Sequence, residues 1–319
     1  MTIVRIVKNW DFPDILRQTP RGNGIWEGIQ FVCGPIEECD YLVFLNNLMQ
    51  REVQAYCPAQ NIWAVMQEPY YRGHSDWLIE GHDFFAKVFT HHPPSQGKKY
   101  ITSHPALPWH VDKNYDQLID MEPPRKTKKI SGIIGNANDL PGHARRFKLL
   151  KVIQADKNLD IDLFGRAVRP IDDKWDGLAP YEFSLAIENS SSFDYWTEKI
   201  ADCFLAWTVP LYYGCKNIDK YFPSDSFIKI DINDPGSCIG VIKLEIEKKS
   251  WKRRLSALEE ARDLVLNRYQ LFPFIAEQIR ASSSTKDRIK KHITIPPYKR
   301  SLRASLNRFI YKLRKTRNF

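Results

Sequence analysis

The sequence has no hydrophobic run long enough to cross a membrane. Among its longest strictly apolar stretches are residues 62–66, whereas a spanning helix needs roughly 18 to 20 such residues. The N-terminal stretch carries Arg5 and Lys8 among its apolar residues and offers no small-residue cleavage site, so it does not resemble a secretory signal. We therefore expect a cytoplasmic protein without a transmembrane helix.

The sequence also lacks the cysteine spacing of a disulfide framework. Its six cysteines are scattered without any CxxC pair, and a chain of 37.3 kDa builds a core without disulfides. We expect buried, reduced thiols rather than nucleophiles. Hydrophobic residues at 43% and charged residues at 27% exclude a disordered or low-complexity chain. A length of 319 residues predicts two domains of roughly 150 residues each.

The positive charge is concentrated at the C-terminal end. Residues 286–319 hold twelve Lys or Arg and one acid, Asp287, a net of +11. The remaining 35 basic and 37 acidic residues nearly cancel. A basic tail on a neutral body indicates an anionic partner surface, either a membrane or a nucleic acid.

Two stretches of different pattern predict an α/β chain with a boundary near its middle. In the first half, short β-rich runs recur between Pro, Gly and Asp or Asn residues; they are residues 2–7, 41–45, 61–67 and 86–91. The stretch EPPRKTKK after Met121 is typical of a domain edge. We predict an N-terminal α/β domain over 1–125, a C-terminal domain over 126–285 and a basic tail over 286–319.

In the second half, expected strands alternate with expected helices, which predicts a parallel sheet with helices on both faces. The strands are expected at 130–134, 161–164, 183–187, 209–213 and 227–230, and the helices at 144–154 and 195–207. Ligands bind beyond the carboxyl ends of the strands in such sheets. The loop 188–194, which follows one strand and precedes one helix, is therefore the expected site.

The start of the helix after this loop carries groups suited to a nucleotide. Asp194 is a candidate N-cap, because its carboxylate can accept from the free amides of the first turn. Lys199 would suit a diphosphate and Glu198 would suit ribose hydroxyls. On local features alone, an ordinary helix acid beside a solvated lysine is the favoured interpretation of this pattern.

The segment LAIENSSSFDYWTEKIADCFLAWTVPLYYGCKNIDKYFPSDSFIKI closely resembles the signature of the α1,3/1,4-fucosyltransferase family. That signature has an apolar residue and Glu-Asn, a polar loop, Asp-Tyr-x-Thr-Glu-Lys, Gly-Thr-Val-Pro-x-Tyr-x-Gly and Pro-x-x-Ser-Phe-Ile. The matching residues are Glu188, Asn189, Asp194, Tyr195, Thr197, Glu198, Lys199, Thr208, Val209, Pro210, Gly214, Pro223, Ser226 and Phe227. The resemblance is tight over about 45 residues and looser over 129–231.

The resemblance implies a GT-B architecture, with two Rossmann-like domains facing a central cleft, and transfer from GDP-fucose with inversion. The residues that it implies for donor binding are Glu188, Asn189, Tyr195, Glu198 and Lys199. It also implies an arginine after a Ser-Asn pair. Here Gly135-Asn136 replaces that pair, and both Arg145 and Arg146 are candidates; the spacing to the apolar stripe of the helix favours Arg145. Trp207 stands where the family usually has Gly.

The resemblance further implies a general base at the end of an N-terminal strand. Glu68 follows the expected strand 61–67, and a carboxylate there can accept the proton of an attacking hydroxyl. The alternative is a surface loop acid.

We expect no metal and no other cofactor. Asp160 and Asp162 resemble the paired acids of metal-dependent transferases, but they lie at a strand start, away from the expected ligand edge.

The leading hypothesis is thus a bacterial, GDP-fucose-dependent transferase acting on a glycan hydroxyl, in α1,3 linkage, in protein glycosylation or lipopolysaccharide synthesis. A related transferase with another nucleotide-sugar donor is the first alternative. A non-enzymatic nucleic-acid-binding protein is the second, but it leaves residues 188–199 unexplained.

The tail itself predicts a basic amphipathic helix. Its apolar residues recur at helical spacing and are Leu302, Leu306, Phe309, Ile310 and Leu313, while Arg303, Asn307, Arg308, Lys312 and Arg314 occupy other faces. Such a helix can lie on an anionic membrane, which would place the protein peripherally on the inner membrane face near a lipid-linked glycan acceptor. The alternative is that the apolar stripe packs on the protein body.

Overall fold

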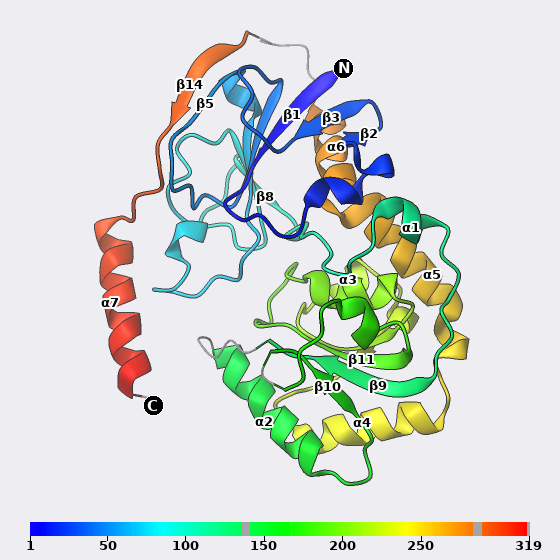
Figure 1. The fold of residues 1–319 in the computed structure, drawn as a ribbon. Helices are drawn as coiled ribbons and strands as arrows, with labels where there is room; N and C mark the ends of the chain where they lie inside the picture. The colour runs from blue at the N-terminus through cyan, green and yellow to red at the C-terminus, as the bar shows by residue number, and fades with distance from the viewer. Residues whose placement is uncertain (136–140, 167, 283–288, 318–319) are drawn as a thin grey trace. The chain divides into compact units, whose positions relative to one another are not determined.

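The computed structural model describes residues 1–135, 141–166, 168–282 and 289–317, and its chain divides into two compact units (Figure 1). Unit 1 contains Met1–Ala106 and Leu271–Phe319, and unit 2 contains Leu107–Gln270. Each unit is built around its own parallel sheet. The predicted α/β class, with two Rossmann-like units, is confirmed.

Unit 1 has a sheet of order β2-β3-β1-β4-β6-β7-β8. Its strands are β1 (Thr2–Val7), β2 (Ile25–Trp26), β3 (Ile29–Val32), β4 (Tyr41–Leu45), β6 (Ile62–Val65), β7 (Lys87–Thr90) and β8 (Tyr100–Thr102). All pairings are parallel except β2 with β3. The central strand β4 reads YLVFL and is buried along its whole length, as expected for a parallel strand covered on both faces.

The C-terminal part of the chain returns to unit 1, so the predicted domain boundaries at 125/126 and 285/286 require correction. Helix α6 (Leu271–Ser282) buries an apolar face, and its Phe272 and Phe274 stack edge-on against Phe31 and Phe89 of the unit 1 sheet, with ring centroids 4.9 and 5.4 Å apart. Conversely, the segment from Leu107 packs into the unit 2 core, where Trp109 is buried. The boundaries between the two units therefore depend on where aromatic side chains pack. The Pro-rich composition of 122–129 does not mark them.

Unit 2 has a five-stranded parallel sheet of order β10-β9-β11-β12-β13. The strands are β9 (Lys128–Ile133), β10 (Asp162–Phe164), β11 (Tyr181–Ile187), β12 (Val209–Tyr213) and β13 (Ile228–Lys229). The helices are α1 (Tyr115–Ile119), α2 (Pro141–Ala155), α3 (Glu198–Leu205), α4 (Pro235–Glu247) and α5 (Leu255–Leu264). Helix α2 lies beside α4, and α3 lies beside α5, so helices cover both faces of the sheet (Figure 1).

Within the described residues of the basic tail, a strand precedes the helix. Strand β14 (Lys291–Ile295) pairs antiparallel with β5 (Val53–Cys57), and Ile295 is buried in the unit 1 core. The tail therefore belongs to unit 1 and is not a separate domain.

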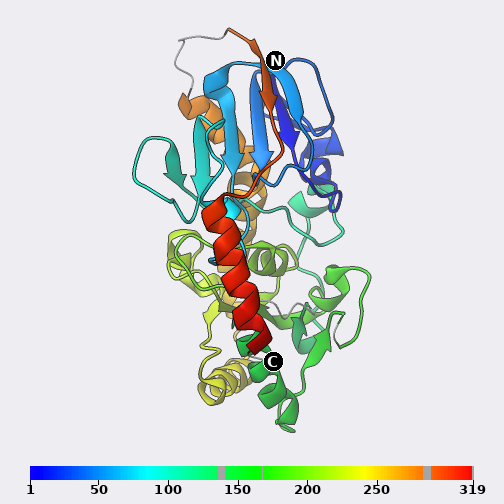
Figure 2. The same ribbon diagram turned by 90° about the vertical axis from the view of Figure 1, so that its left-hand side faces the viewer.

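Helix α7 (Leu302–Arg317) follows and faces the viewer in Figure 2. It contacts unit 1 through Ala304, Asn307 and Tyr311, which share one face at helical spacing. Ala304 is buried, and the side-chain oxygen of Asn307 accepts a hydrogen bond from Arg72 at 3.0 Å. A Cβ added to Gly73, which has φ +81°, would lie 2.4 Å from the carbonyl oxygen of Asn307. Helix α7 therefore packs closely against the loop of unit 1 that contains Gly73.

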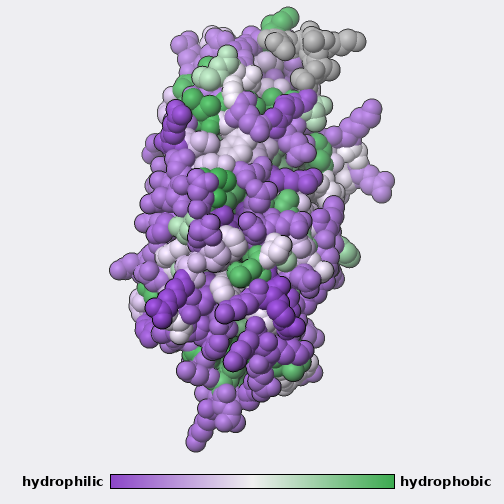
Figure 3. Space-filling model, turned by 90° about the vertical axis from the view of Figure 1, so that its right-hand side faces the viewer, coloured by the Kyte–Doolittle hydropathy of each residue, from purple (hydrophilic) through white to green (hydrophobic). Residues whose placement is uncertain are grey.

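The apolar stripe of α7 is not the face that contacts the body. Its exposed fractions are 92% for Leu302, 59% for Leu306, 59% for Phe309, 37% for Ile310 and 49% for Leu313. On the face of the molecule drawn in Figure 3, by contrast, hydrophobic residues form only small, separated groups. The predicted amphipathic helix is thus present, and the alternative in which its stripe packs on the body is contradicted. Within the described residues, no helix combines the length and apolarity that a membrane span requires.

Candidate functional site

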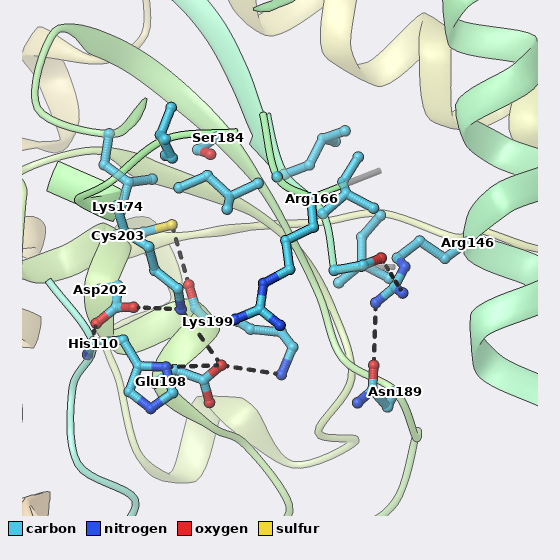
Figure 4. Close-up of a pocket in the computed structure, with 18 of the residues that line it drawn as sticks. His110, Arg146, Arg166, Lys174, Ser184, Asn189, Glu198, Lys199, Asp202 and Cys203 are labelled. Atoms are coloured by element: carbon cyan, nitrogen blue, oxygen red, sulfur yellow. Dashed lines mark hydrogen bonds and ion pairs between the residues drawn. The ribbon is translucent and has the colours of Figure 1, made fainter. Parts of the chain in front are cut away.

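A cavity of about 410 Å³ opens at the carboxyl ends of β9, β10 and β11, within unit 2 (Figure 4). This is the sheet edge where the sequence predicts a ligand. Its polar lining residues are His110, Arg146, Arg166, Lys174, Ser184, Asn189, Glu198, Lys199, Asp202 and Cys203. Its apolar wall includes Ile134 and Leu185. The pocket therefore combines an apolar wall with a concentration of charged groups.

The N-terminus of α3 presents Glu198 and Lys199 to this pocket. Thr197 is the N-cap, because its hydroxyl accepts a hydrogen bond from the backbone N–H of Lys199. The prediction that Asp194 caps a helix starting at Tyr195 is wrong. Asp194 has φ +57°, and its carboxylate instead accepts from the Tyr221 hydroxyl at 2.6 Å. The helix begins at Glu198 as a result.

Glu188 stabilises the N-terminal end of α3. Its buried carboxylate accepts from the backbone N–H of Thr197 at 2.8 Å and lies 3.2 Å from Nζ of Lys199. Burial raises the pKa of the Glu188 carboxyl, although Lys199 opposes that effect. A Cβ on Gly214 would lie 2.3 Å from Cγ of Glu188. A residue larger than glycine would therefore clash at this position of the motif. Glu188 does not line the pocket, and its predicted contact with a donor stays a prediction.

Two lysines and a histidine surround the carboxylate of Glu198. Its Oε1 lies 3.5 Å from Nζ of Lys199, 3.6 Å from Nζ of Lys174 and 3.9 Å from Nδ1 of His110. Burial by itself would raise the pKa of Glu198, but Lys199, Lys174 and His110 outweigh it and hold the pKa well below its usual range. Glu198 is thus an ionised hydrogen-bond acceptor at neutral pH.

Lys174, His110 and Asp202 are pocket residues that the sequence analysis missed. Nζ of Lys174 lies 2.9 Å from Oδ2 of Asp202, and Oδ1 of Asp202 accepts from the backbone N–H of His110 at 2.8 Å. Burial lowers the pKa of His110, and nearby Lys174 adds to that effect. Asp202 lies four residues after Glu198 on α3, so helical spacing could have placed both on one face. Lys174 begins a separate 3-10 helix, η5 (Lys174–Gly177), and carries no such signal.

Of the two candidate arginines, the structure brings Arg146 into the pocket. Arg146 is 5% exposed, and its guanidinium donates to Oδ1 of Asn189 at 3.2 Å and to the carbonyl of Gly135 at 3.1 Å. Arg145, which the spacing favours, is exposed and reaches Asn233 instead, at 3.4 Å. Asn136, which the sequence analysis aligned with the family pair, lies outside the described residues.

Two further signature positions are buried away from the pocket lining. Tyr195 is 2% exposed and does not line the cavity, so its predicted donor contact stays a prediction. Trp207, where the family usually has Gly, has φ +56°, a left-handed conformation that glycine adopts without cost. The Trp207 indole N–H donates to the carbonyl of Met121 at 3.1 Å, and Arg262 lies over its ring. These contacts stabilise the unusual residue at that position.

Glu68 lies in unit 1, shortly after β6, and its side chain is exposed. The preceding Gln67 is buried, and its backbone N–H donates to Oδ1 of Asn46 at 2.7 Å. Asn46 follows the neighbouring strand β4 with φ +64°. The predicted position of Glu68 beyond a buried strand is confirmed, whereas its role as a base stays a prediction.

Part of unit 2 is similar to a known protein family. Residues 123–237 match the family model described as glycosyltransferase family 10 (fucosyltransferase) C-term. The matched residues include the segment 185–230, which carries the fucosyltransferase signature.

Among similar proteins, 4-galactosyl-N-acetylglucosaminide 3-alpha-L-fucosyltransferase 9 from Mus musculus and from Homo sapiens is 34% identical over 154 residues, which cover 46% of this chain and 40% of each relative. A putative fucosyltransferase-like protein from Arabidopsis thaliana is 36% identical over 121 residues, which cover 36% of this chain and 23% of that relative. The chain thus matches less than half of the length of these curated relatives. A solved alpha1,3-fucosyltransferase with GDP aligns over 82% of each chain with 17% identity and a TM-score of 0.49.

Proposed function

We propose that this protein transfers L-fucose from GDP-fucose to a hydroxyl of a glycan, with inversion at the anomeric carbon. The observation that carries the proposal is the pocket at the strand ends of unit 2, part of which matches the family 10 fucosyltransferase model, where Glu198, Lys199 and Arg146 converge. The relatives named as 3-alpha-L-fucosyltransferases support an α1,3 linkage.

In the proposed complex, Glu198 accepts hydrogen bonds from the ribose hydroxyls of GDP. Its low pKa keeps it ionised for this purpose, and hydrogen bonds to an ionised acceptor are the stronger kind. Lys199 and Arg146 face the diphosphate. Asn189 holds the Arg146 guanidinium in place through their 3.2 Å hydrogen bond, so the cation is oriented before the donor arrives.

In the proposed reaction, the acceptor oxygen forms a bond to the anomeric carbon on the face opposite the diphosphate. The bond from that carbon to the phosphate oxygen breaks, and its electron pair leaves with GDP. The acceptor proton passes to the carboxylate of Glu68. Lys199 and Arg146 stabilise the charge that develops on GDP, which is usually the largest single contribution to catalysis of this kind. We propose that these cations act without a metal ion.

Calorimetric titration with GDP tests the donor site. Lys199→Ala should weaken GDP binding by about 1.5 to 3 kcal/mol, the contribution of a hydrogen bond to a charged group. The exposed Lys216, in the same unit but outside the pocket lining, provides the matched control Lys216→Ala, whose affinity should equal wild type. An unchanged affinity in a folded Lys199→Ala protein would refute the assignment.

We further propose that α7 lies on an anionic membrane surface. The exposed apolar stripe and the basic side chains beside it support this partner; the exposed cations are Arg303, Lys312 and Arg314. Interfacial binding has two components. The apolar face of the helix inserts among the acyl chains, and each cation adds about 1 kcal/mol of attraction to anionic lipid. A lipid-linked glycan would be a fitting acceptor there.

Cosedimentation with vesicles tests the membrane proposal. The double variant Leu306→Gln/Phe309→Gln should lose binding to vesicles of phosphatidylcholine with phosphatidylglycerol, while Phe84→Gln, at another exposed aromatic of unit 1, should keep it. A truncation should be made after Arg300 rather than near 284, because β14 pairs with β5. Equal binding by the double variant and wild type, or no binding by wild type at low salt, would contradict the proposal.

A further inference from the structure

The lysines of the pocket are already paired with carboxylates. Nζ of Lys199 lies 3.2 Å from Glu188 and 3.5 Å from Glu198. Nζ of Lys174 lies 2.9 Å from Asp202 and 3.6 Å from Glu198. These two cations share three carboxylates, so the cluster that they form carries no excess positive charge. A diphosphate with at least two negative charges requires more cations than this cluster supplies.

Arginines provide that charge. Arg146 is positioned by the neutral oxygens of Asn189 and Gly135, which orient its guanidinium without cancelling its charge. Arg166 is the second arginine in the pocket lining. In the part of the chain that the structure describes, no side chain or backbone group forms a hydrogen bond or an ion pair with the Arg166 guanidinium.

The backbone before Arg166 fixes where this side chain starts. Gly165 follows β10 with φ +116°, and a Cβ at this position would lie 2.0 Å from the carbonyl oxygen of Ile134. Only glycine fits so close to the end of β9, and the chain therefore passes directly over that strand end. From there Arg166 extends into the pocket toward Lys199, with Arg146 reaching in from α2 on the other side (Figure 4).

We infer that Arg166 binds the diphosphate of the nucleotide-sugar donor, together with Arg146 and Lys199. This inference rests on the proposed function and adds a residue that the fucosyltransferase signature does not contain. A guanidinium suits the task because its planar N–H groups match phosphate oxygens two at a time. The side chain is exposed before the donor binds, and the donor supplies the anionic partner that it lacks.

Calorimetry with guanosine, GMP and GDP on the full-length protein tests the inference. Arg166→Gln should weaken GDP binding by about tenfold or more, the scale of a lost hydrogen bond to a charged group, and leave guanosine binding unchanged. Arg166→Lys should restore part of the GDP affinity, because it keeps the charge but loses the planar donors.

Arg169 provides the matched control in the same loop. Its guanidinium is paired with Asp162 at 3.1 Å and lies over the ring of Phe164, and it does not line the pocket. Arg169→Gln should therefore bind GDP as wild type does.

Three results would overturn the inference, and they differ from a failure of the proposed function. Equal GDP affinity in Arg166→Gln and wild type excludes a phosphate contact. An equal loss of guanosine and GDP binding assigns Arg166 to the nucleoside instead. A loss in Arg169→Gln as large as that in Arg166→Gln shows a general charge effect. If wild-type protein binds none of the three probes, the proposed donor itself is wrong.

Discussion

Replacing Lys174 by methionine should make GDP binding sensitive to mildly acidic pH. Lys174 is one of the cations that hold the pKa of Glu198 well below its usual range, and the other contributors are Lys199 and His110. The ionised form of Glu198 accepts hydrogen bonds from ribose hydroxyls more strongly than the protonated form does.

The size of the effect follows from the geometry. Two unit charges about 4 Å apart interact by about 1 kcal/mol in water and about 4 kcal/mol at the effective dielectric of a protein surface. Nζ of Lys174 lies 3.6 Å from Oε1 of Glu198, and the two side chains are 26% and 13% exposed. The energy of their interaction therefore lies between these limits. Its loss raises the pKa of Glu198, while Lys199 and His110 remain in place.

The lowered pKa of Glu198 sets the direction of the pH effect. A carboxylate with a lowered pKa keeps its function above that pKa and loses it as pH falls through it. The contribution of Glu198 to GDP affinity should therefore stay level in wild type as the pH is lowered from 7.5 toward 5, because the pKa of Glu198 lies below this interval. In Lys174→Met the decline should begin at a higher pH, and Lys174→Arg should restore the wild-type profile.

Isothermal titration at a series of pH values is the appropriate assay. Lys113 provides the control, since it lies outside the pocket lining and its nearest carboxylate is Asp173, at 3.9 Å. Lys113→Met should keep the wild-type profile. A folded Lys174→Met protein whose affinity depends on pH in the same way as wild type would refute the reasoning.

Two other predictions concern the reaction. Glu68→Gln should lower turnover by about 10²- to 10⁴-fold, as loss of a general base does, with GDP affinity unchanged; turnover within a few-fold of wild type in a transfer assay would exclude this base. Activity should also survive an excess of chelator, because in the proposed complex Arg146 and Lys199 face the leaving diphosphate; complete loss that Mg²⁺ or Mn²⁺ restores would contradict that role.

Much of the fold could be predicted because apolar runs mark the buried strands. The predicted ranges 2–7, 41–45 and 209–213 coincide with β1, β4 and β12. The return of the chain to unit 1 could not be predicted, because it depends on where the aromatic rings of α6 pack. Local composition near residue 125 carries no information about that contact.

Part of the site could likewise be predicted from the local sequence, whereas the rest depends on long-range contacts. Glu198 and Lys199 could be located because their environment is a strand, a loop and a helix start in continuous sequence. The choice of Arg146 over Arg145 depends on which side of α2 faces Asn189, and the role of Lys174 depends on η5 meeting α3. Such contacts join residues far apart in the chain, and helical or strand periodicity does not reveal them.

Binding of a GDP-sugar by this pocket can be measured by thermal unfolding of the full-length protein with GDP, UDP, ADP, CDP and GDP-fucose. A ligand at 100 times its dissociation constant stabilises the folded state by about 2.7 kcal/mol. GDP and GDP-fucose should raise the unfolding temperature, and the other nucleotides should leave it unchanged at equal concentration. A larger shift with UDP, ADP or CDP than with GDP, or no shift with any of them, would contradict the account.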